Sequence, residues 1–183
     1  ENATYNISCT VRVAGNPSST MTDSMDVVVN KPGLPSSVAT PVGVPTTPGK
    51  FASYLGNDFY LTDAGDIIAK DSQGKLVINQ FVCDGTYTYF LQADGTAMRD
   101  RLTYHPDGVH VIYFNQYGHE VFSDFAHVKK SIAGVPVDDY CFFDVNGYLY
   151  VDVVTYDKTG TYLYYANPYG VLERDKWFQF SNT

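Results

Sequence analysis

Apolar and polar residues alternate along the first 30 positions of the chain. Between residues 3 and 13, every second side chain from Tyr5 to Val13 falls on one face, which is the period of a half-buried β-strand. A polar loop that contains Gly15 and Pro17 follows, and residues 25–30 have the pattern of a second strand. This alternation predicts a β-hairpin over residues 1–30.

From residue 51 onward the alternation is confined to short aromatic strands that end at glycines. The clearest copy is residues 86–95, Thr-Tyr-Thr-Tyr-Phe-Leu-Gln-Ala-Asp-Gly, in which an aromatic strand runs into a polar turn closed by Gly95. Similar copies end at Gly118, Gly147 and Gly170, and a weaker one ends at Gly65. Each copy predicts one β-hairpin.

The spacing of these turn glycines indicates a repeat. The glycines at 65, 95, 118, 147 and 170 are separated by 30, 23, 29 and 23 residues. An Asp follows four of them after five or six residues: Asp100, Asp124, Asp152 and Asp175. A position that recurs in this way serves the repeat, most simply by accepting hydrogen bonds in a turn. Such periods predict an all-β fold of stacked β-hairpin repeats, either solenoid-like or a rolled meander.

The stretch between the two β regions has a different composition. Residues 31–50 contain five prolines and no aromatic or acidic residue, which predicts an extended, semi-rigid linker. We therefore divide the chain into a hairpin at 1–30, a proline-rich linker at 31–50 and a repeat module at 51–183. Helical signals are weak, and we expect no more than a loop or a single turn at residues 124–130.

Composition favours contact with sugars and argues against other partners. The chain has 16 Tyr, 11 Phe and 1 Trp, and tyrosine suits both half-buried strands and surfaces that stack on sugar rings. A net charge of −8 argues against a nucleic-acid partner, because a phosphate backbone demands clustered Lys and Arg. No run approaches the roughly 18 apolar residues of a membrane span, so we expect no membrane insertion. No signal peptide is recognised at Glu1, which suggests an excerpt from a longer precursor.

The repeated phrase consists of two or three aromatic residues, a short Asp or Asn turn, a glycine and an apolar strand. It resembles the cell-wall-binding, or choline-binding-like, repeats of Gram-positive surface proteins, a group that includes glucan-binding repeats. The resemblance covers about residues 57–180. It implies a secreted or cell-surface, non-enzymatic module that binds a glycan. Residues 1–30 resemble the closing hairpin of a bacterial immunoglobulin-like domain, and a hairpin that packs on the following domain is an equal alternative.

The chain departs from this family at the positions that would bind choline. Choline-binding members carry Trp seven residues before the turn glycine, and this chain has other residues there: Asp58, Thr88, Val111, Tyr140 and Leu163. A cation cage needs several electron-rich faces around one quaternary ammonium. The sequence therefore argues against a choline site.

Outward-facing aromatic residues are the candidates for ligand binding. Neighbouring residues of a strand point to opposite faces, so each aromatic pair is expected to place one ring inward and one outward, where it can stack on a pyranose. Cross-strand packing is the alternative role for any one of these rings. The candidates are Tyr87, Tyr89, Tyr113, Tyr140, Tyr162, Tyr164, Tyr165 and Trp177.

No motif for catalysis or metal binding is recognised. The histidines match no short metal-binding spacing, and we expect each on the surface or in a turn: His105, His110, His119 and His127. The three cysteines indicate neither a zinc site nor a disulfide framework, and pairing of Cys83 with Cys141 is left open.

Taken together, these features predict non-catalytic binding of a polysaccharide or cell-wall glycan, with no cofactor and no metal. A structural stalk or adhesin segment that projects another domain or contacts a host protein is the alternative. Whether the repeats also form a homo-oligomer is left open by the sequence.

Overall fold

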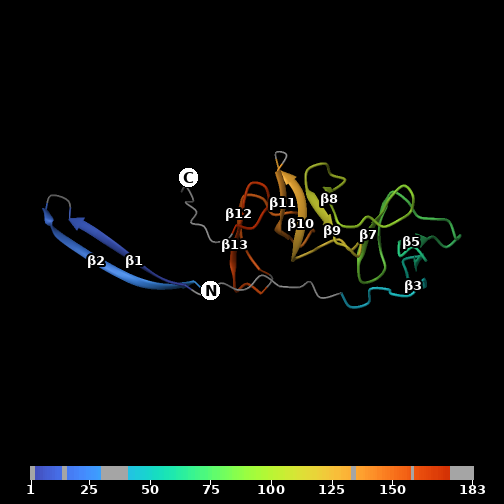
Figure 1. Cartoon of the computed structure of the whole chain (residues 1–183), viewed down its shortest axis with the longest axis horizontal. Coiled ribbons are helices and arrows are strands. Elements are labelled where there is room, and N and C mark those ends of the chain that lie inside the picture. Colours follow the sequence, from blue (N-terminus) through green and yellow to red (C-terminus); the bar gives the residue numbers. More distant parts are fainter. Residues whose placement is uncertain (1–2, 14–15, 30–40, 133–134, 158, 174–183) are drawn as a thin grey trace. The chain divides into compact units, whose positions relative to one another are not determined.

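The computed structural model describes residues 3–13, 16–29, 41–132, 135–157 and 159–173. The chain divides into two compact units, residues 1–43 and 44–183, which are described separately below. Every regular element in the described part is a β-strand, and all sheets are small and antiparallel (Figure 1). The predicted fold class, all-β with stacked β-hairpins, is confirmed.

The first unit contains one long hairpin. Strands β1 (Ala3–Val13) and β2 (Asn16–Val29) pair antiparallel, with Tyr5 opposite Val27. The second strand is longer than its apolar pattern suggested, because residues 16–20, expected in a loop, lie in β2, where Thr20 pairs with Arg12. Threonine has a high β propensity, and the backbone hydrogen bonds between strands do not require an apolar side chain. Of the predicted linker, residues 31–40 lie outside the described residues, and residues 41–48 contain no strand.

The second unit is a series of hairpins that follow one another in chain order along its length (Figure 1). Its strands are β3 (Gly49–Tyr54), β4 (Asn57–Leu61), β5 (Ile67–Lys70), β6 (Gln80–Cys83), β7 (Thr88–Leu91), β8 (Arg101–Tyr104), β9 (Val111–Phe114), β10 (Asp124–Ile132), β11 (Val135–Phe143), β12 (Val153–Tyr156) and β13 (Leu163–Ala166). Strand β3 adds a third strand to the hairpin β4–β5. The expected loop or turn at 124–130 is wrong, because these residues form β10, in which Ala126 and Val128 are buried against neighbouring strands.

A tight turn closes each repeat after its second strand. In residues 92–96, the Gly95 N–H donates to the Gln92 carbonyl at 2.9 Å and the Gln92 N–H donates to the Thr96 carbonyl at 2.9 Å. Gly95 has a φ of +84°, which glycine adopts without steric cost. Where the first turn residue is Asp or Asn, its side chain accepts backbone N–H groups of the turn. Asn115 does so from Tyr117 at 2.9 Å and from His119 at 3.1 Å.

The register of the repeat differs from the predicted one at its start. Gly65 lies in the loop that joins β4 to β5, whereas Gly74 takes the place equivalent to Gly95. The turn glycines are therefore 74, 95, 118, 147 and 170, with separations of 21, 23, 29 and 23 residues. The long step of 29 arises because β10 and β11 have nine residues each, whereas β8 and β9 have four.

Two cross-strand pairs in each hairpin carry the packing between repeats. One pair faces the following hairpin, and we call it the forward pair: Phe59–Ala69, Phe81–Phe90, Leu102–Tyr113, Phe125–Phe142 and Val154–Tyr165. The adjacent pair faces the preceding hairpin, and we call it the backward pair: Tyr60–Ile68, Val82–Tyr89, Thr103–Ile112, Ala126–Cys141 and Thr155–Tyr164.

Ring contacts and buried clusters follow this rule at each of four junctions. Phe59 lies 6.1 Å from Tyr89 between ring centroids, and Phe125 lies 5.0 Å from Tyr164. At the two junctions between them, Phe81 and Phe90 pack with Ile112, and Leu102 and Tyr113 pack with Ala126 and Cys141. Each of the three middle hairpins therefore buries one face against the repeat before it and the other against the repeat after it.

A backbone hydrogen bond fixes each junction in register. The donor is the N–H of the residue two positions after a turn glycine. The acceptor is a carbonyl in the preceding hairpin, at the residue seven positions before the turn glycine of that hairpin. These bonds are Ala97 to Ile67, Glu120 to Thr88 and Leu149 to Val111 at 2.8 Å, and Leu172 to Tyr140 at 2.9 Å. The same four places therefore combine a buried backbone bond with apolar packing.

Gly95→Ala is predicted to destabilise the second unit more than Gly108→Ala. Both glycines have left-handed φ angles, +84° and +72°, so both substitutions strain the backbone by about 1 kcal/mol. A Cβ on Gly95 would also lie 2.4 Å from Leu76, whereas a Cβ on Gly108 would meet nothing within 4 Å. We expect a further loss of about 1–3 kcal/mol for Gly95→Ala from overpacking, measured by denaturant unfolding. Equal losses for the two variants would contradict this account of the turn.

Candidate binding surface

Two of the predicted binding tyrosines are core residues. Tyr89 and Tyr113 are 0% and 4% exposed, so the expectation that they face outward is wrong. Their hydroxyls donate to Asp84 and Asp100, each at 2.7 Å, and burial together with these carboxylates raises the pKa of both phenols. The expectation fails because neighbouring repeats cover both faces of a hairpin, whereas a sheet with one wet face would leave every second ring exposed.

The other candidates differ in how far packing engages them. Tyr140 lies with its ring edge-on to His127 at 4.9 Å, and Tyr164 lies edge-on to Phe125 at 5.0 Å. The Tyr165 hydroxyl donates to Asp152 at 2.7 Å. Trp177 lies outside the described residues. The binding role of the candidates other than Tyr89 and Tyr113 stays a prediction.

The Asp that recurs after the turn glycine holds a tyrosine of its own hairpin. Asp100 and Asp152 have φ angles of +43° and +51°, and each accepts the hydroxyl of a tyrosine 13 residues later in the chain. Ser123 has the equivalent backbone conformation, with a φ of +47°, ahead of β10. In the two described cases that carry Asp, this place therefore serves the repeat by accepting a tyrosine hydroxyl.

Parallel ring stacks join consecutive repeats at two junctions. The ring eight residues before a turn glycine stacks on the residue just after the next turn glycine. Tyr87 stacks on His119 with centroids 3.7 Å apart and an interplanar angle of 5°, and His110 stacks on Tyr148 at 3.9 Å and 6°. Sequence reasoning missed these stacks. Aligning the repeats on their turn glycines would have shown that Tyr87 is equivalent to His110, and His119 to Tyr148.

Tyr162 occupies the same place in the last described hairpin. It lies eight residues before Gly170 and is 39% exposed, and no ring of a described residue stacks on it. The loop that carries it is held by Asp157, whose Oδ1 accepts the backbone N–H groups of Thr161 and Tyr162 at 3.0 Å. Hydrogen bonds from Thr159 and from these N–H groups lower the pKa of the Asp157 carboxyl. The backbone that carries the Tyr162 ring is therefore held by hydrogen bonds to Asp157.

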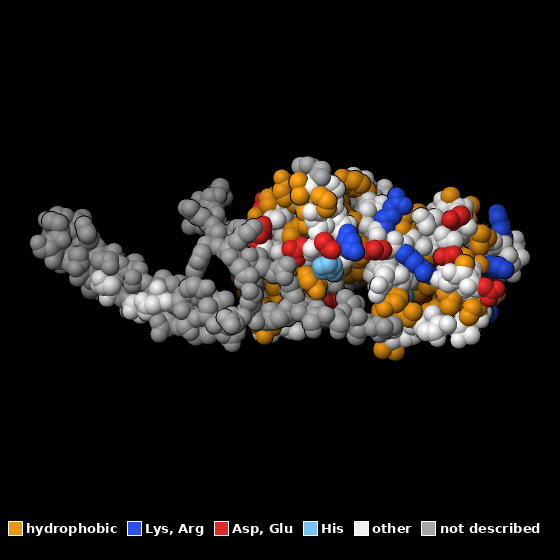
Figure 2. Space-filling model, viewed as in Figure 1, with side chains coloured by type: hydrophobic (Ala, Val, Ile, Leu, Met, Phe, Trp, Pro, Cys, Tyr) orange, Lys and Arg blue, Asp and Glu red, His pale blue; other side chains and the backbone are white. Residues whose placement is uncertain are grey.

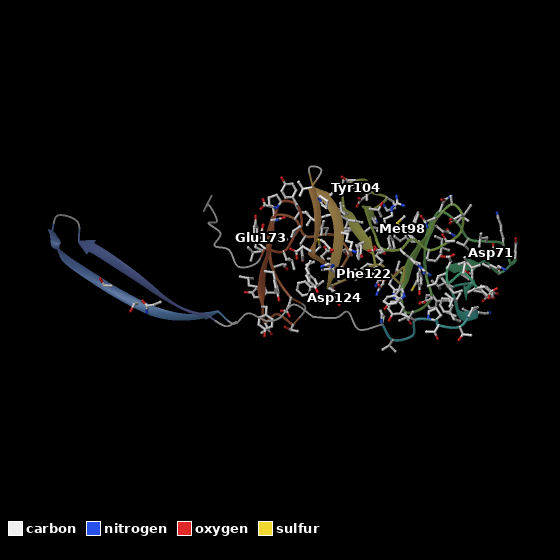
Figure 3. All side chains as sticks on the ribbon, viewed as in Figure 1. Asp71, Met98, Tyr104, Phe122, Asp124 and Glu173 are labelled. Carbon is white, nitrogen blue, oxygen red and sulfur yellow. The ribbon has the colours of Figure 1, made fainter. Side chains whose placement is uncertain are left out.

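More exposed apolar side chains lie at the loop ends of the short hairpins. Tyr156 and Leu163, a cross-strand pair next to Tyr162, are each 58% exposed. Tyr104 is 68% exposed at the rim of the stack, whereas Met98 lies inside it (Figure 3). On the face shown in Figure 2, such apolar side chains alternate with acidic and basic ones, and no continuous basic region is visible.

His119 lies in the turn 115–119, where the Asn115 N–H donates to its carbonyl at 2.9 Å, but its ring is buried between repeats. Its ring is 2% exposed, with Tyr87 stacked on one face, and neither ring nitrogen has a hydrogen-bond partner. Burial lowers the pKa of His119 to about 4, because the charged form would lose its hydration. Burial also raises the pKa of the adjacent Glu120 to about 7.

A small cluster of titratable residues lies on the loop between β8 and β9. Asp107 Oδ2 lies 2.6 Å from His110 Nδ1 and 3.0 Å from His105 Nδ1. The His110 side chain, and to a smaller extent the His110 backbone N–H, form hydrogen bonds that hold the pKa of Asp107 well below its usual range. Within the described ranges no group of three or more His, Cys, Asp or Glu side chains is arranged to hold a metal ion.

Cys83 and Cys141 are free thiols, which settles the pairing that the sequence left open. Cys141 lies in the core between β9 and β10, and Cys83 at the end of β6. The described part of the chain contains no helix that is long and apolar enough to cross a membrane.

No protein-family model and no curated protein matches this sequence. The structure is similar to that of a truncated alternansucrase from Leuconostoc mesenteroides, with a TM-score of 0.49 and 19% identity over 63% of this chain and 10% of that chain. The modular Cpl-1 endolysin, complexed with a peptidoglycan analogue, is similar with a TM-score of 0.44 and 13% identity over 75% of this chain and 42% of that chain. The modular autolysin LytC from Streptococcus pneumoniae is similar with a TM-score of 0.32 and 16% identity over 67% of this chain and 32% of that chain. The chain therefore spans less than half of each of these proteins.

His119→Phe is predicted to remove a loss of stability in acid. The unfolded chain binds a proton at His119 near pH 6.5, whereas the folded chain does so only near pH 4, so the free energy of unfolding falls as the pH drops through this window. At about 1.4 kcal/mol per pKa unit, the difference between variant and unmodified protein should grow by about 3 kcal/mol from pH 7 to pH 4. Denaturant unfolding at a series of pH values would measure it.

Glu120→Gln is predicted to change the pH dependence of stability in the opposite direction to His119→Phe. The folded chain keeps a proton on Glu120 up to about pH 7, whereas the unfolded chain loses it near pH 4.5, so this residue lowers the free energy of unfolding as the pH rises. The gain from Glu120→Gln should therefore grow from pH 4.5 to pH 7. If both variants changed stability equally at all pH values, the burial of these two groups would not be the cause.

Proposed function

We propose that the second unit binds a polysaccharide or cell-wall glycan without catalysis, by stacking a sugar ring on Tyr162. The observation that carries the proposal is that, among the described residues, no ring stacks on that of Tyr162; we call this the open place above Tyr162. Tyr87 and His110, at the equivalent place of earlier repeats, each have a ring stacked within 3.9 Å. Tyr162 is 39% exposed on the same kind of loop. The C–H face of a pyranose is flat and apolar enough to take the position of the missing ring.

The surroundings of Tyr162 support a ligand of this kind. Tyr156 and Leu163 extend the exposed apolar surface at the same end of the hairpin β12–β13. Tyrosine hydroxyls can donate to and accept from sugar hydroxyls while the rings pack on carbon. Because hydrogen bonds to Asp157 already hold the backbone of Thr161 and Tyr162, binding a sugar there would cost little conformational entropy at these two residues.

The proposal includes a location outside the cell, where cell-wall glycans and secreted polysaccharides are found. The family resemblance of the repeated phrase supports this location, and the net charge of −8 favours neither nucleic acid nor an anionic membrane as the partner. The proposal contains no chemical step, since the described titratable clusters are explained by turns and by the contacts between repeats.

Tyr162→Ala is predicted to weaken glycan binding about tenfold, which corresponds to about 1.4 kcal/mol. The full chain would first be screened against a glycan array and purified cell walls, and the affinity for the best ligand would then be measured by calorimetry. Tyr104→Ala is the matched control, because Tyr104 is exposed on a hairpin whose His110 is already stacked.

Two results would contradict the proposal. If the unmodified chain bound no glycan and no cell wall, the structural stalk or adhesin function would take its place. If Tyr104→Ala weakened binding as much as Tyr162→Ala, a sugar would bind, but not at the open place above Tyr162.

A further inference from the structure

The tip of the hairpin β3–β4 carries an exposed leucine in a strained conformation. The two strands end in the pair Tyr54–Asn57, and the residues between them, Leu55 and Gly56, have φ angles of +47° and +81°. Glycine takes such angles freely, whereas a leucine is strained there. The other described non-glycine residues with a positive φ are short and polar: Asn79, Asp100, Ser123 and Asp152. Leu55 is 81% exposed, so packing in the core does not compensate for its strain, and such an outlier points to a function of the tip.

Next to this tip, the ring of Tyr54 lies flat against the backbone of the following hairpin. A Cβ added to Gly85, in the loop between β6 and β7, would lie 3.2 Å from Tyr54 Cδ2 and 3.6 Å from both ring neighbours of that atom, Cγ and Cε2. Such nearly equal distances place Gly85 over the face of the ring, because an approach in the ring plane would leave both neighbours much farther away than Cδ2. The glycine therefore permits a close contact that a side chain would obstruct.

The opposite face of the Tyr54 ring is open. The side chain is 43% exposed although Gly85 covers one face, and no ring of a described residue stacks on the other. The loop under the ring is held by Asp84, whose Oδ1 accepts the backbone N–H groups of Thr86 and Tyr87 at 2.8 Å each. The ring is therefore supported from behind by a backbone that hydrogen bonds hold in place.

A polar side chain lies beside this ring. Asn57 is directly opposite Tyr54 in the ladder, so the two side chains share one face of the hairpin, with Cβ atoms about 5 Å apart. The Asn57 amide has no hydrogen bond to another described side chain, and it can both donate to and accept from hydroxyl groups. A flat apolar surface with a polar group at its edge is the combination that recognises a sugar.

We propose that Tyr54 forms a second sugar-binding place, in which a pyranose stacks on its open face, Leu55 extends the apolar surface and Asn57 bonds to sugar hydroxyls. A protein partner fits this place less well, because a specific protein interface buries about 1,000 Å² or more and two exposed side chains supply only a small part of that area. The choice of a sugar as the ligand rests on the proposed function. The place itself is separate from Tyr162, because β3 and β12–β13 belong to the first and the last described hairpins of the unit.

Two places on one unit would make binding depend on the length of the glycan. A chain that reaches both places binds the second one at a high effective concentration, so it binds more tightly than a chain that reaches only one. Tyr54→Ala should therefore weaken the binding of long polysaccharides more than that of short oligosaccharides.

The methyl groups of two leucines distinguish this place from the one at Tyr162. The full chain, labelled with ¹³C at its leucine methyl groups, is titrated with oligomers of glucose and of N-acetylglucosamine and with soluble fragments of purified cell walls. We expect resonances of Leu55 to shift together with those of Leu163, the neighbour of Tyr162. A shift of Leu163 alone would support the proposed function and overturn the second place, whereas no shift at either leucine would overturn both.

Matched variants of the same hairpin assign the contact. Tyr54→Ala should weaken the binding measured at Leu55 about tenfold and leave the response of Leu163 unchanged, whereas Tyr54→Phe, which keeps a ring, should retain most of the binding. Tyr60→Ala is the control, because Lys70 Nζ lies over the Tyr60 ring, 5.2 Å from its centroid. Binding at Leu55 that survives Tyr54→Ala would overturn the stacking on Tyr54.

Leu55→Asn provides a readout that a purely structural leucine would not give. Asparagine tolerates the left-handed conformation, so this variant should raise the midpoint of thermal unfolding while it weakens sugar binding, followed through the ring protons of Tyr54. A rise in stability with unchanged binding would exclude Leu55 from the place. Shifts of Leu55 that appear with rising protein concentration and without sugar would instead assign the tip to a contact with a second copy of the chain.

Discussion

The packing of each forward pair on the backward pair of the next hairpin is the constraint on which the second unit depends. A two-stranded hairpin with four-residue strands is not stable in water by itself, because it buries too little apolar surface. Stacking covers both faces of each of the three middle hairpins, and the N–H of the residue two places after the turn glycine fixes the register by donating to the preceding hairpin. The close approach of Gly95 to Leu76 leaves no room for a side chain at that place.

This constraint decides which aromatic residues are available to a ligand. A ring in a forward or backward pair, such as Phe59 or Tyr89, packs inside the stack, and the Tyr89 hydroxyl donates to Asp84. The positions left over lie at the loop ends of the hairpins and on a face that no described repeat covers. Tyr162 and Tyr156 are in such positions, which is why they, rather than the most aromatic strands, carry the functional argument.

Much of the fold could be predicted from the sequence, because each hairpin combines local signals: aromatic alternation, a polar turn and a left-handed glycine. Gly74 was missed as a turn glycine because its strand, Ile67–Lys70, has no aromatic residue, and β10 was missed because it continues past the usual length of the repeat. The binding surface was harder to predict from the sequence than the fold. Alternation tells which rings share a face, but not whether a neighbouring repeat covers that face, and Tyr89 and Tyr113 were misplaced for this reason.

The four junctions are not equivalent, and the difference is electrostatic. The two residues after the turn glycine are Tyr148 and Leu149 at one junction and Val171 and Leu172 at another, but His119 and Glu120 at the junction between the hairpins β6–β7 and β8–β9. Burial makes His119 unfavourable in acid and Glu120 unfavourable toward neutral pH. Because the two windows overlap between about pH 4.5 and 6.5 with opposite slopes, the two costs offset each other there. A junction that contains two buried titratable groups can thus keep a nearly constant stability over a range in which either group alone would weaken it.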